Sequence, residues 1–157
     1  ILTKDDYTSL IGMRNRLFSS HECMDLLSSG EAEVPQVWKD EDIDVLCKCK
    51  ADYWNKDKKI LVDIKTTTDA SPSGFKLSVK KYSYDRQSAY YSDGFNADRF
   101  IFIVIEKTAP YNMGIYECSG ETLEIGRDKY KYLLGVYRKF FINSEIDPYE
   151  FVHQELI

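Results

Sequence analysis

The sequence predicts an α/β domain with a mixed central β-sheet flanked by helices. Residues 99–106 form an almost unbroken apolar run between polar ends, which is typical of a central strand covered on both faces. Residues 31–38, 43–54 and 60–67 read as further strands, and segments with helical periodicity precede and follow them. A chain of 157 residues, 43% of them hydrophobic, is expected to form a single domain over residues 1–157.

The first two elements are expected to be helices. Thr3 and Asp6 form a capping-box-like start, and apolar residues at helical spacing predict a helix over residues 4–18. Ser20 can cap a second, short helix, which the Ser-Ser-Gly sequence at residues 28–30 ends.

A meander of three strands is expected next. Polar and apolar residues alternate over 31–38, and an acidic stretch separates this segment from residues 43–54, so the two should pair as a hairpin. A polar turn at residues 55–59 leads into residues 60–67, which are β-branched and alternating. The third strand should therefore lie beside the second.

Helices and strands alternate in the second half of the chain. The expected elements are a loop at 71–74, a helix over 78–92 ended by Asp93 and Gly94, a strand over 113–118 beside the central one, and a helix from Ser119 to about residue 141. The resulting order, α-α-β-β-β-α-β-β-α, indicates helices packed around a mixed sheet.

Composition and charge restrict the possible classes of protein. No apolar run approaches the roughly 20 residues that span a bilayer, and no signal-peptide pattern opens the chain, so no membrane association and a cytoplasmic location are expected. The net charge of −5 argues against a generally cationic surface that coats nucleic acid. The chain starts at Ile1 without a methionine, so further residues are expected upstream in the full protein.

Three charged residues interrupt the predicted second and third strands. Side chains alternate across a strand, so Asp63 and Lys65 share one face, and the short turn between the strands lets Asp52 lie near Asp63. Charges in an apolar strand cost free energy unless they are paired or coordinated. A surface ion pair is the plainer interpretation of an isolated Asp-x-Lys, but the apolar setting favours a site.

Two converging carboxylates repel each other, and a hard divalent cation relieves that repulsion. Mg²⁺, or Mn²⁺ in its place, would polarise a phosphate and activate a bound water there. Lys65 would orient or deprotonate the water, or neutralise the transition state. The sequence therefore predicts hydrolysis of phosphodiester bonds.

The same residues resemble a known nuclease superfamily. Asp52 followed by Asp63-Ile64-Lys65 is similar to the PD-(D/E)xK pattern, with Ala51 where proline often stands, and Gln87 and Tyr91 resemble the Q-x-x-x-Y helix of its RecB-like branch. Residues 45–52, 63–67 and 87–94 look most like the exodeoxyribonuclease VIII (RecE-type) phage recombination exonucleases.

The resemblance carries expectations beyond those drawn from the residues. It implies a restriction-endonuclease-like core and a Mg²⁺-dependent 5′-to-3′ exonuclease acting on double-stranded DNA ends, in a bacterial or phage-infected cell. Such enzymes often form ring-shaped homo-oligomers that work with a single-strand annealing protein. Asp52 and Asp63 would bind the metal, Ile64 would bind it through its carbonyl, and Lys65 would be the catalytic lysine.

Three further positions are less defined. Gln87 and Tyr91 would face the site and contact DNA or water, although they would also suit a polar helix face. Glu33 resembles an acidic residue that completes the metal shell in this family, and a solvated carboxylate is the alternative. The family's upstream histidine has no match, and His21 is expected to be exposed.

Other functions remain open at this stage. A non-catalytic DNA-binding or assembly module would keep the fold without cleavage, although intact Asp52, Asp63 and Lys65 count against it. A structure-specific endonuclease would use the same site. An iron–sulfur relative would need a cysteine before the core and a cluster of three near the C-terminus, and that pattern is absent from the sequence.

Overall fold

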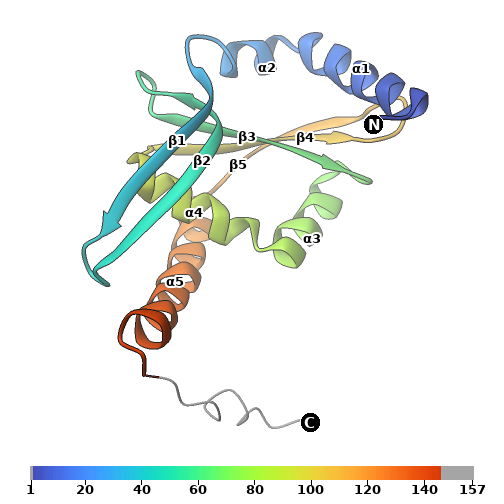
Figure 1. Cartoon of the computed structure of the whole chain (residues 1–157). Helices are drawn as coiled ribbons and strands as arrows, with labels where there is room; N and C mark the ends of the chain where they lie inside the picture. Colours follow the sequence, from blue (N-terminus) through green and yellow to red (C-terminus); the bar gives the residue numbers. More distant parts are fainter. Residues whose placement is uncertain (1, 146–157) are drawn as a thin grey trace, which may run out of the picture.

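The computed structural model describes residues 2–145, which form one sheet with helices on both faces (Figure 1). The five strands lie in the order β1 (Glu31–Asp40), β2 (Val45–Asn55), β3 (Ile60–Thr67), β4 (Arg99–Glu106) and β5 (Met113–Glu117). The β3–β4 pair is parallel and the other neighbours are antiparallel, so the predicted mixed sheet is confirmed.

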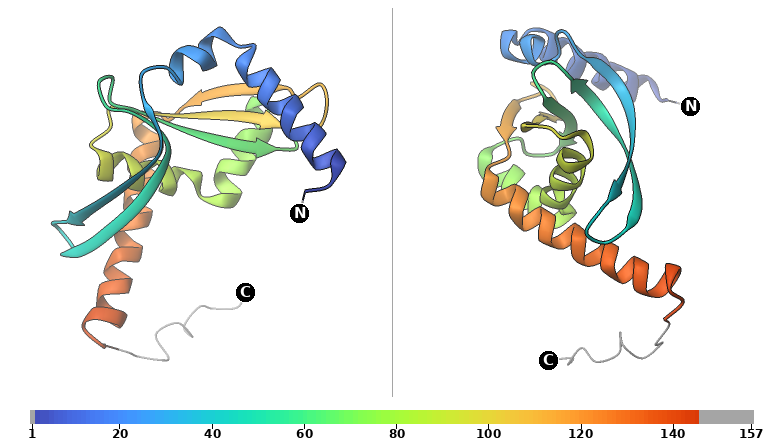
Figure 2. Two further views of the ribbon diagram at one scale, coloured as in Figure 1. Left: turned by 45° about the horizontal axis from the view of Figure 1, so that its top comes forward. Right: turned by 90° about the vertical axis from the view of Figure 1, so that its left-hand side faces the viewer.

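Helices cover the sheet in two layers (Figures 1 and 2). The helices are α1 (Lys4–Phe18) and α2 (His21–Leu26) on one face, α3 (Pro72–Tyr82) and α4 (Tyr84–Phe95) on the other, and α5 (Gly120–Tyr137), which packs on α4 and ends in a five-residue π-helix, η1 (Arg138–Ile142). No helix of this described part is long and apolar enough to cross a membrane.

The core forms two clusters, one on each face of the sheet. The cluster toward α3 and α4 contains Leu61, Phe75, Phe100, Phe102 and Val104 among others, and the cluster toward α1 and α2 contains Cys23, Tyr53, Val62, Ile101 and Ile103. The side chains of β4 alternate between the two clusters, which explains why its sequence is apolar at nearly every position.

The predicted helix starts are confirmed by their caps. Thr3 and Asp6 make a reciprocal capping box at α1, Ser20 accepts a hydrogen bond from the N–H of Cys23 at α2, and Ser119 accepts one from Thr122 at α5. The bounds of α1, β3 and β4 agree with the ranges expected from the sequence.

The prediction of one helix over residues 78–92 was wrong. The segment forms two helices, because Ser83 adopts a left-handed conformation (φ 54°, ψ 47°) that ends α3 and begins α4. The expected loop at 71–74 is the start of α3, where Ser71 caps the N–H of Gly74 and Pro72 takes the first helical position.

Gly94 lies inside α4 and does not end it. A Cβ at Gly94 would lie 2.7 Å from the ring of Trp38, so glycine is needed there for close packing of β1 on the helix. The helix instead ends at Asn96, which takes the left-handed conformation common at helix C-termini.

The sheet forks between β2 and β3. Only three residue pairs join these strands, Tyr53 with Val62, Trp54 with Leu61 and Asn55 with Ile60, whereas β1 and β2 stay paired over their full length. Beyond the fork the β1–β2 hairpin curves over α4 (Figure 2). The ring centroids of Trp38 on β1 and Tyr90 on α4 lie 4.5 Å apart. The predicted meander is confirmed, with an opening on one side of β3.

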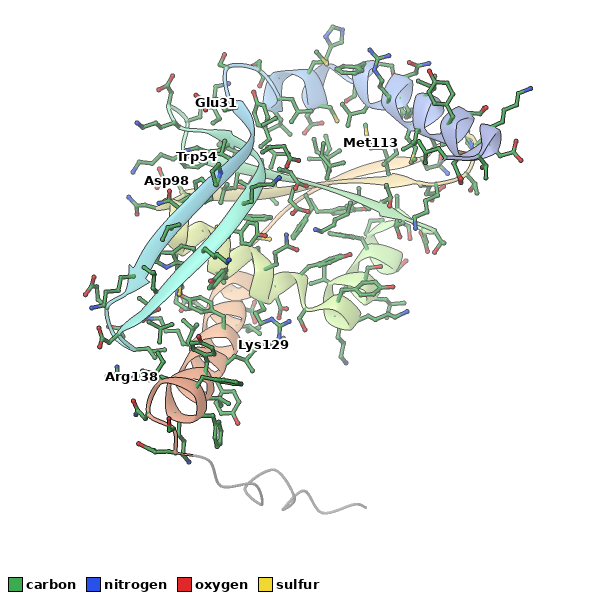
Figure 3. The ribbon with its side chains drawn as sticks, in the orientation of Figure 1. Glu31, Trp54, Asp98, Met113, Lys129 and Arg138 are labelled. Carbon is green, nitrogen blue, oxygen red and sulfur yellow. The ribbon has the colours of Figure 1, made fainter. Side chains whose placement is uncertain are left out.

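The far tip of the hairpin is tied to the start of η1, directly after α5. Arg138, labelled in Figure 3, donates a hydrogen bond to the carbonyl of Ile43 and lies 3.5 Å from a carboxylate oxygen of Asp44. Glu31 and Trp54, also labelled, pair at the opposite end of the hairpin. At that end Trp54 also pairs with Leu61 of β3, so the hairpin is held by β3 at one end and by Arg138 at its tip, and the fork lies between them.

Candidate active site at the fork of the sheet

Asp52 and Asp63 lie at the point where β2 and β3 separate. The last pair of the ladder is Tyr53 with Val62, so the next positions in register are Asp52 and Asp63. Asp52 bridges the opening, because its Oδ2 accepts a hydrogen bond from the backbone N–H of Ile64 at 3.0 Å. The structure thus brings together the two carboxylates that the sequence predicted to converge.

Asp63 is a buried carboxylate with an incomplete set of partners. Its residue is 3% exposed, and burial raises the pKa of its carboxyl, an effect that the Lys65 ammonium opposes and the charge of Asp52 reinforces. Gln87 Nε2 donates to Asp63 Oδ2 at 2.6 Å. Oδ1 lies 2.7 Å from Lys65 Nζ, yet within residues 2–145 it accepts no hydrogen bond of proper geometry.

Lys65 lies between the acidic pair and an aromatic ring. Its side chain is 20% exposed, and its Nζ is 4.8 Å from the centre of the Tyr84 ring. The ring face is electron-rich, so it attracts the ammonium that also pairs with Asp63. The lysine is therefore held in place by a carboxylate and a ring.

The helix α4 supplies the remaining side chains. Gln87 and Tyr91 are one turn apart and both face the acids: Gln87 bonds Asp63, and the pKa of the Tyr91 phenol is raised mainly by burial and further by nearby Cys49, Asp63 and Asp52. The contact of Tyr84 with Lys65 is not apparent from the sequence. Its only signal is that residues 84, 87 and 91 share a helical face.

The structure does not bring Glu33 to the other acids. Glu33 is exposed, has a left-handed backbone (φ 59°) and forms an ion pair with Lys50. No three His, Cys, Asp or Glu side chains of the described chain gather into a group that would hold a metal ion. Glu33 is thus a solvent-exposed carboxylate beside Lys50, and His21 is exposed as expected.

The two carboxylates nevertheless suit Mg²⁺. This ion keeps several of its waters and is commonly held by one or two carboxylates together with substrate phosphates, so a cage of three acidic side chains is not required. Within residues 2–145 the buried Oδ1 of Asp63 meets the Lys65 ammonium but accepts no hydrogen bond of proper geometry, and this is the observation that fits a further cation. Asp52, Asp63 and the Ile64 carbonyl are the groups that would hold it.

The fold is shared with proteins of known structure. One is a putative exonuclease from Eubacterium rectale, with a TM-score of 0.70 and 16% sequence identity over 90% of this chain. The present chain covers 55% of that protein's length. Another is a phage-related exonuclease from Haemophilus somnus 129PT, with a TM-score of 0.56, 10% identity, and coverage of 93% of this chain and 76% of the other.

Sequence comparisons identify the family directly. No curated protein matches this chain. A family model described as a PDDEXK-like domain of unknown function (DUF3799) matches residues 1–149. The mixed sheet, the flanking helices and this match over nearly the whole sequence agree with a restriction-endonuclease-like α/β fold. The chain therefore belongs to the family of PDDEXK-like domains.

Proposed function

We propose that this chain is a Mg²⁺-dependent deoxyribonuclease that hydrolyses phosphodiester bonds. We propose further that it starts at the ends of double-stranded DNA and proceeds in the 5′-to-3′ direction. The observation that carries the proposal is the pair Asp52 and Asp63 at the fork, with a buried oxygen of Asp63 2.7 Å from the Lys65 ammonium. Nuclease chemistry needs this combination of anionic ligands and a nearby cation.

The protein's own residues would divide the work as follows. Gln87 holds Asp63 through Oδ2, so that Oδ1 keeps a fixed direction toward Lys65. Lys65, steadied by Tyr84, can donate hydrogen bonds to an attacking water or to a phosphate oxygen that becomes more negative in the transition state. When bound, Mg²⁺ would supply Lewis-acid polarisation of the phosphate and a lowered pKa for a coordinated water.

The preference for DNA ends and the direction of cleavage rest on the resemblance of residues 45–94 to the RecE-type exonucleases. The exonuclease names of the two structural neighbours support the same proposal. By that resemblance we also propose a ring-shaped homo-oligomer and a single-strand annealing protein as partner.

The decisive experiment compares linear duplex DNA with covalently closed circles in Mg²⁺, with Asp63→Asn as the control. Degradation of the linear substrate alone, with loss in the variant, is the expected result. Labels on the 5′ or the 3′ ends of separate substrates then give the direction. Discrete fragments from closed circles would favour an endonuclease, and DNA binding without any cleavage would favour a non-catalytic module.

A further inference from the structure

A small pocket is lined in part by Lys65, while neither Asp52 nor Asp63 lines it. Its volume is about 210 Å³, and it lies between the end of β3, the helix α3 and the segment that follows β4. We call it the lysine pocket, because Lys65, Lys81 and Lys107 line it together with the three threonines at residues 66–68. Three cations and several hydroxyls thus converge on one hollow.

The acids next to the lysine pocket are engaged elsewhere. Asp69 accepts a hydrogen bond from the backbone N–H of Ser71 at 2.8 Å, and Glu106 accepts from the N–H of Ala70 and the side chain of Asn112. No acidic side chain lines the pocket within the part of the chain that the structure describes. Its charge is therefore opposite to that of the neighbouring Asp52 and Asp63 pair, which Lys65 also contacts through Asp63.

Two stacked rings hold the cations along one wall. Lys65 Nζ lies 4.8 Å from the Tyr84 ring centre, the rings of Tyr84 and Tyr82 stack at 5.5 Å, and Lys81 Nζ lies 5.1 Å from the Tyr82 ring centre. Lys107 is fixed through its backbone, whose N–H donates to the carbonyl of Thr67 at 3.0 Å. The cations are thus partly positioned in the absence of a ligand.

The size of the pocket restricts the ligand. Pockets for drug-sized molecules start at roughly 300 Å³, and liquid water occupies roughly 30 Å³ per molecule, so this one holds a single anionic group with a few waters. We propose that the lysine pocket binds the phosphate next to the scissile phosphate on the cleaved strand. This inference rests on the proposed function, since Lys65 both lines the pocket and pairs with Asp63 of the proposed cleavage site.

The test removes the negative charge of the DNA phosphate and the positive charge of the pocket lysines in turn. One set of duplexes carries a single neutral methylphosphonate at successive linkages near the end. The protein variants are Lys81→Ala, Lys107→Ala and Lys81→Arg, with Lys80→Ala as the matched control, because it is the adjacent exposed lysine of α3 and does not line the pocket. Binding is measured in Ca²⁺ and single-turnover cleavage in Mg²⁺.

At one linkage, the methylphosphonate should weaken binding to the wild type roughly tenfold, the effect of one lost charge-assisted hydrogen bond. The same methylphosphonate should weaken binding to Lys81→Ala or Lys107→Ala by less than about twofold, because the lysine that contacts this phosphate is already missing. Each alanine variant should also lower the salt dependence of binding by about one counterion. Lys80→Ala should behave like the wild type, whereas Lys81→Arg keeps the positive charge and should therefore keep the weakening by the methylphosphonate at that linkage.

The inference would be overturned if the methylphosphonate weakened binding to the alanine variants as much as to the wild type at every linkage. It would also be overturned if Lys80→Ala and Lys81→Ala lost the same binding affinity. Failure of the proposed function has a different signature, because the wild type would then leave the unmodified duplex uncut in Mg²⁺. The Ca²⁺ binding curves do not depend on cleavage, so they test the pocket in either case.

Discussion

Gln87 Nε2 lies 2.6 Å from Asp63 Oδ2, which ties the first half of α4 to the buried end of the acidic pair. An amide donor on a carboxylate that is only 3% exposed offsets part of the cost of burying its charge. The same bond directs the other oxygen, Oδ1, toward Lys65. The helix therefore sets the orientation of a proposed metal ligand that it does not itself carry.

Asp63→Asn should stabilise the metal-free protein at neutral pH and abolish Mn²⁺ binding. Burial raises the pKa of Asp63 above its unfolded value of about 3.9, so the folded state binds the proton more tightly. Stability of the metal-free wild type should therefore fall as pH rises from the unfolded pKa toward the folded one. Thermal unfolding with a chelator across this range, beside a Mn²⁺ titration, checks both effects. If Asp63→Asn gave the same Mn²⁺ titration as the wild type, the metal would bind at a site that does not include Asp63.

Lys65→Ala should cut single-turnover cleavage while metal binding stays intact. A preorganised charge that acts mainly in the transition state contributes on the order of 3 kcal/mol, about a hundredfold or more in rate. Lys65→Arg should not restore activity, because the wider and always protonated guanidinium does not replace a compact ammonium. A cleavage rate near that of the wild type in Lys65→Ala would reduce Lys65 to an ion-pair partner of Asp63.

Tyr84→Leu should slow cleavage, whereas Tyr84→Phe should not. The ring that attracts Lys65 is kept in phenylalanine and lost in leucine, and a cation–π contact contributes about 0.5–1 kcal/mol, or a few-fold in rate. Because Tyr84 also packs on Phe75 and Phe102, the stability of both variants is measured by thermal unfolding. Equal rates in the two folded variants would show that the ring acts only in packing.

Asp93→Asn should destabilise the protein at neutral pH but have little effect in acid. Asp93 is paired with Arg127 at 2.6 Å and accepts a hydrogen bond from Tyr130, and these partners overcome burial and hold its pKa below the usual range. The stabilisation is therefore present above the unfolded pKa of about 3.9 and is lost as pH falls through the folded pKa. Urea unfolding at several pH values, with the exposed Lys58→Ala as control, measures the difference.

Much of the fold follows from local patterns. The bounds of β3 and β4 were predictable because a strand covered by core on both faces needs an apolar or β-branched sequence. The break at Ser83 was not, since residues 78–92 contain no glycine or proline to interrupt a helix. Packing on the sheet, with Phe75 of α3 and Tyr84 of α4 both touching Phe102, accompanies that break.

The site was predictable to the same extent. Alternation along a strand places Asp63 beside Lys65, and the short turn places Asp52 near Asp63. The ion pair of Glu33 with Lys50 could not be predicted in this way, because regular alternation along a strand does not reveal the left-handed backbone at Glu33. The contact of Tyr84 with Lys65 could not be predicted either, because it joins α4 to β3 and depends on how the helix packs on the sheet.

The position of β1 at the edge of the sheet has a consequence for association between copies of the chain. Among the strands of residues 2–145, one side of this ten-residue strand has no neighbour, and an unpaired strand edge can template the addition of a strand from another molecule. Pro35 lacks a backbone N–H, the turned backbone at Glu33 breaks the regular edge, and Lys39 adds charge. The hairpin that carries Asp52 is therefore protected against amyloid-like stacking, although it is long and exposed.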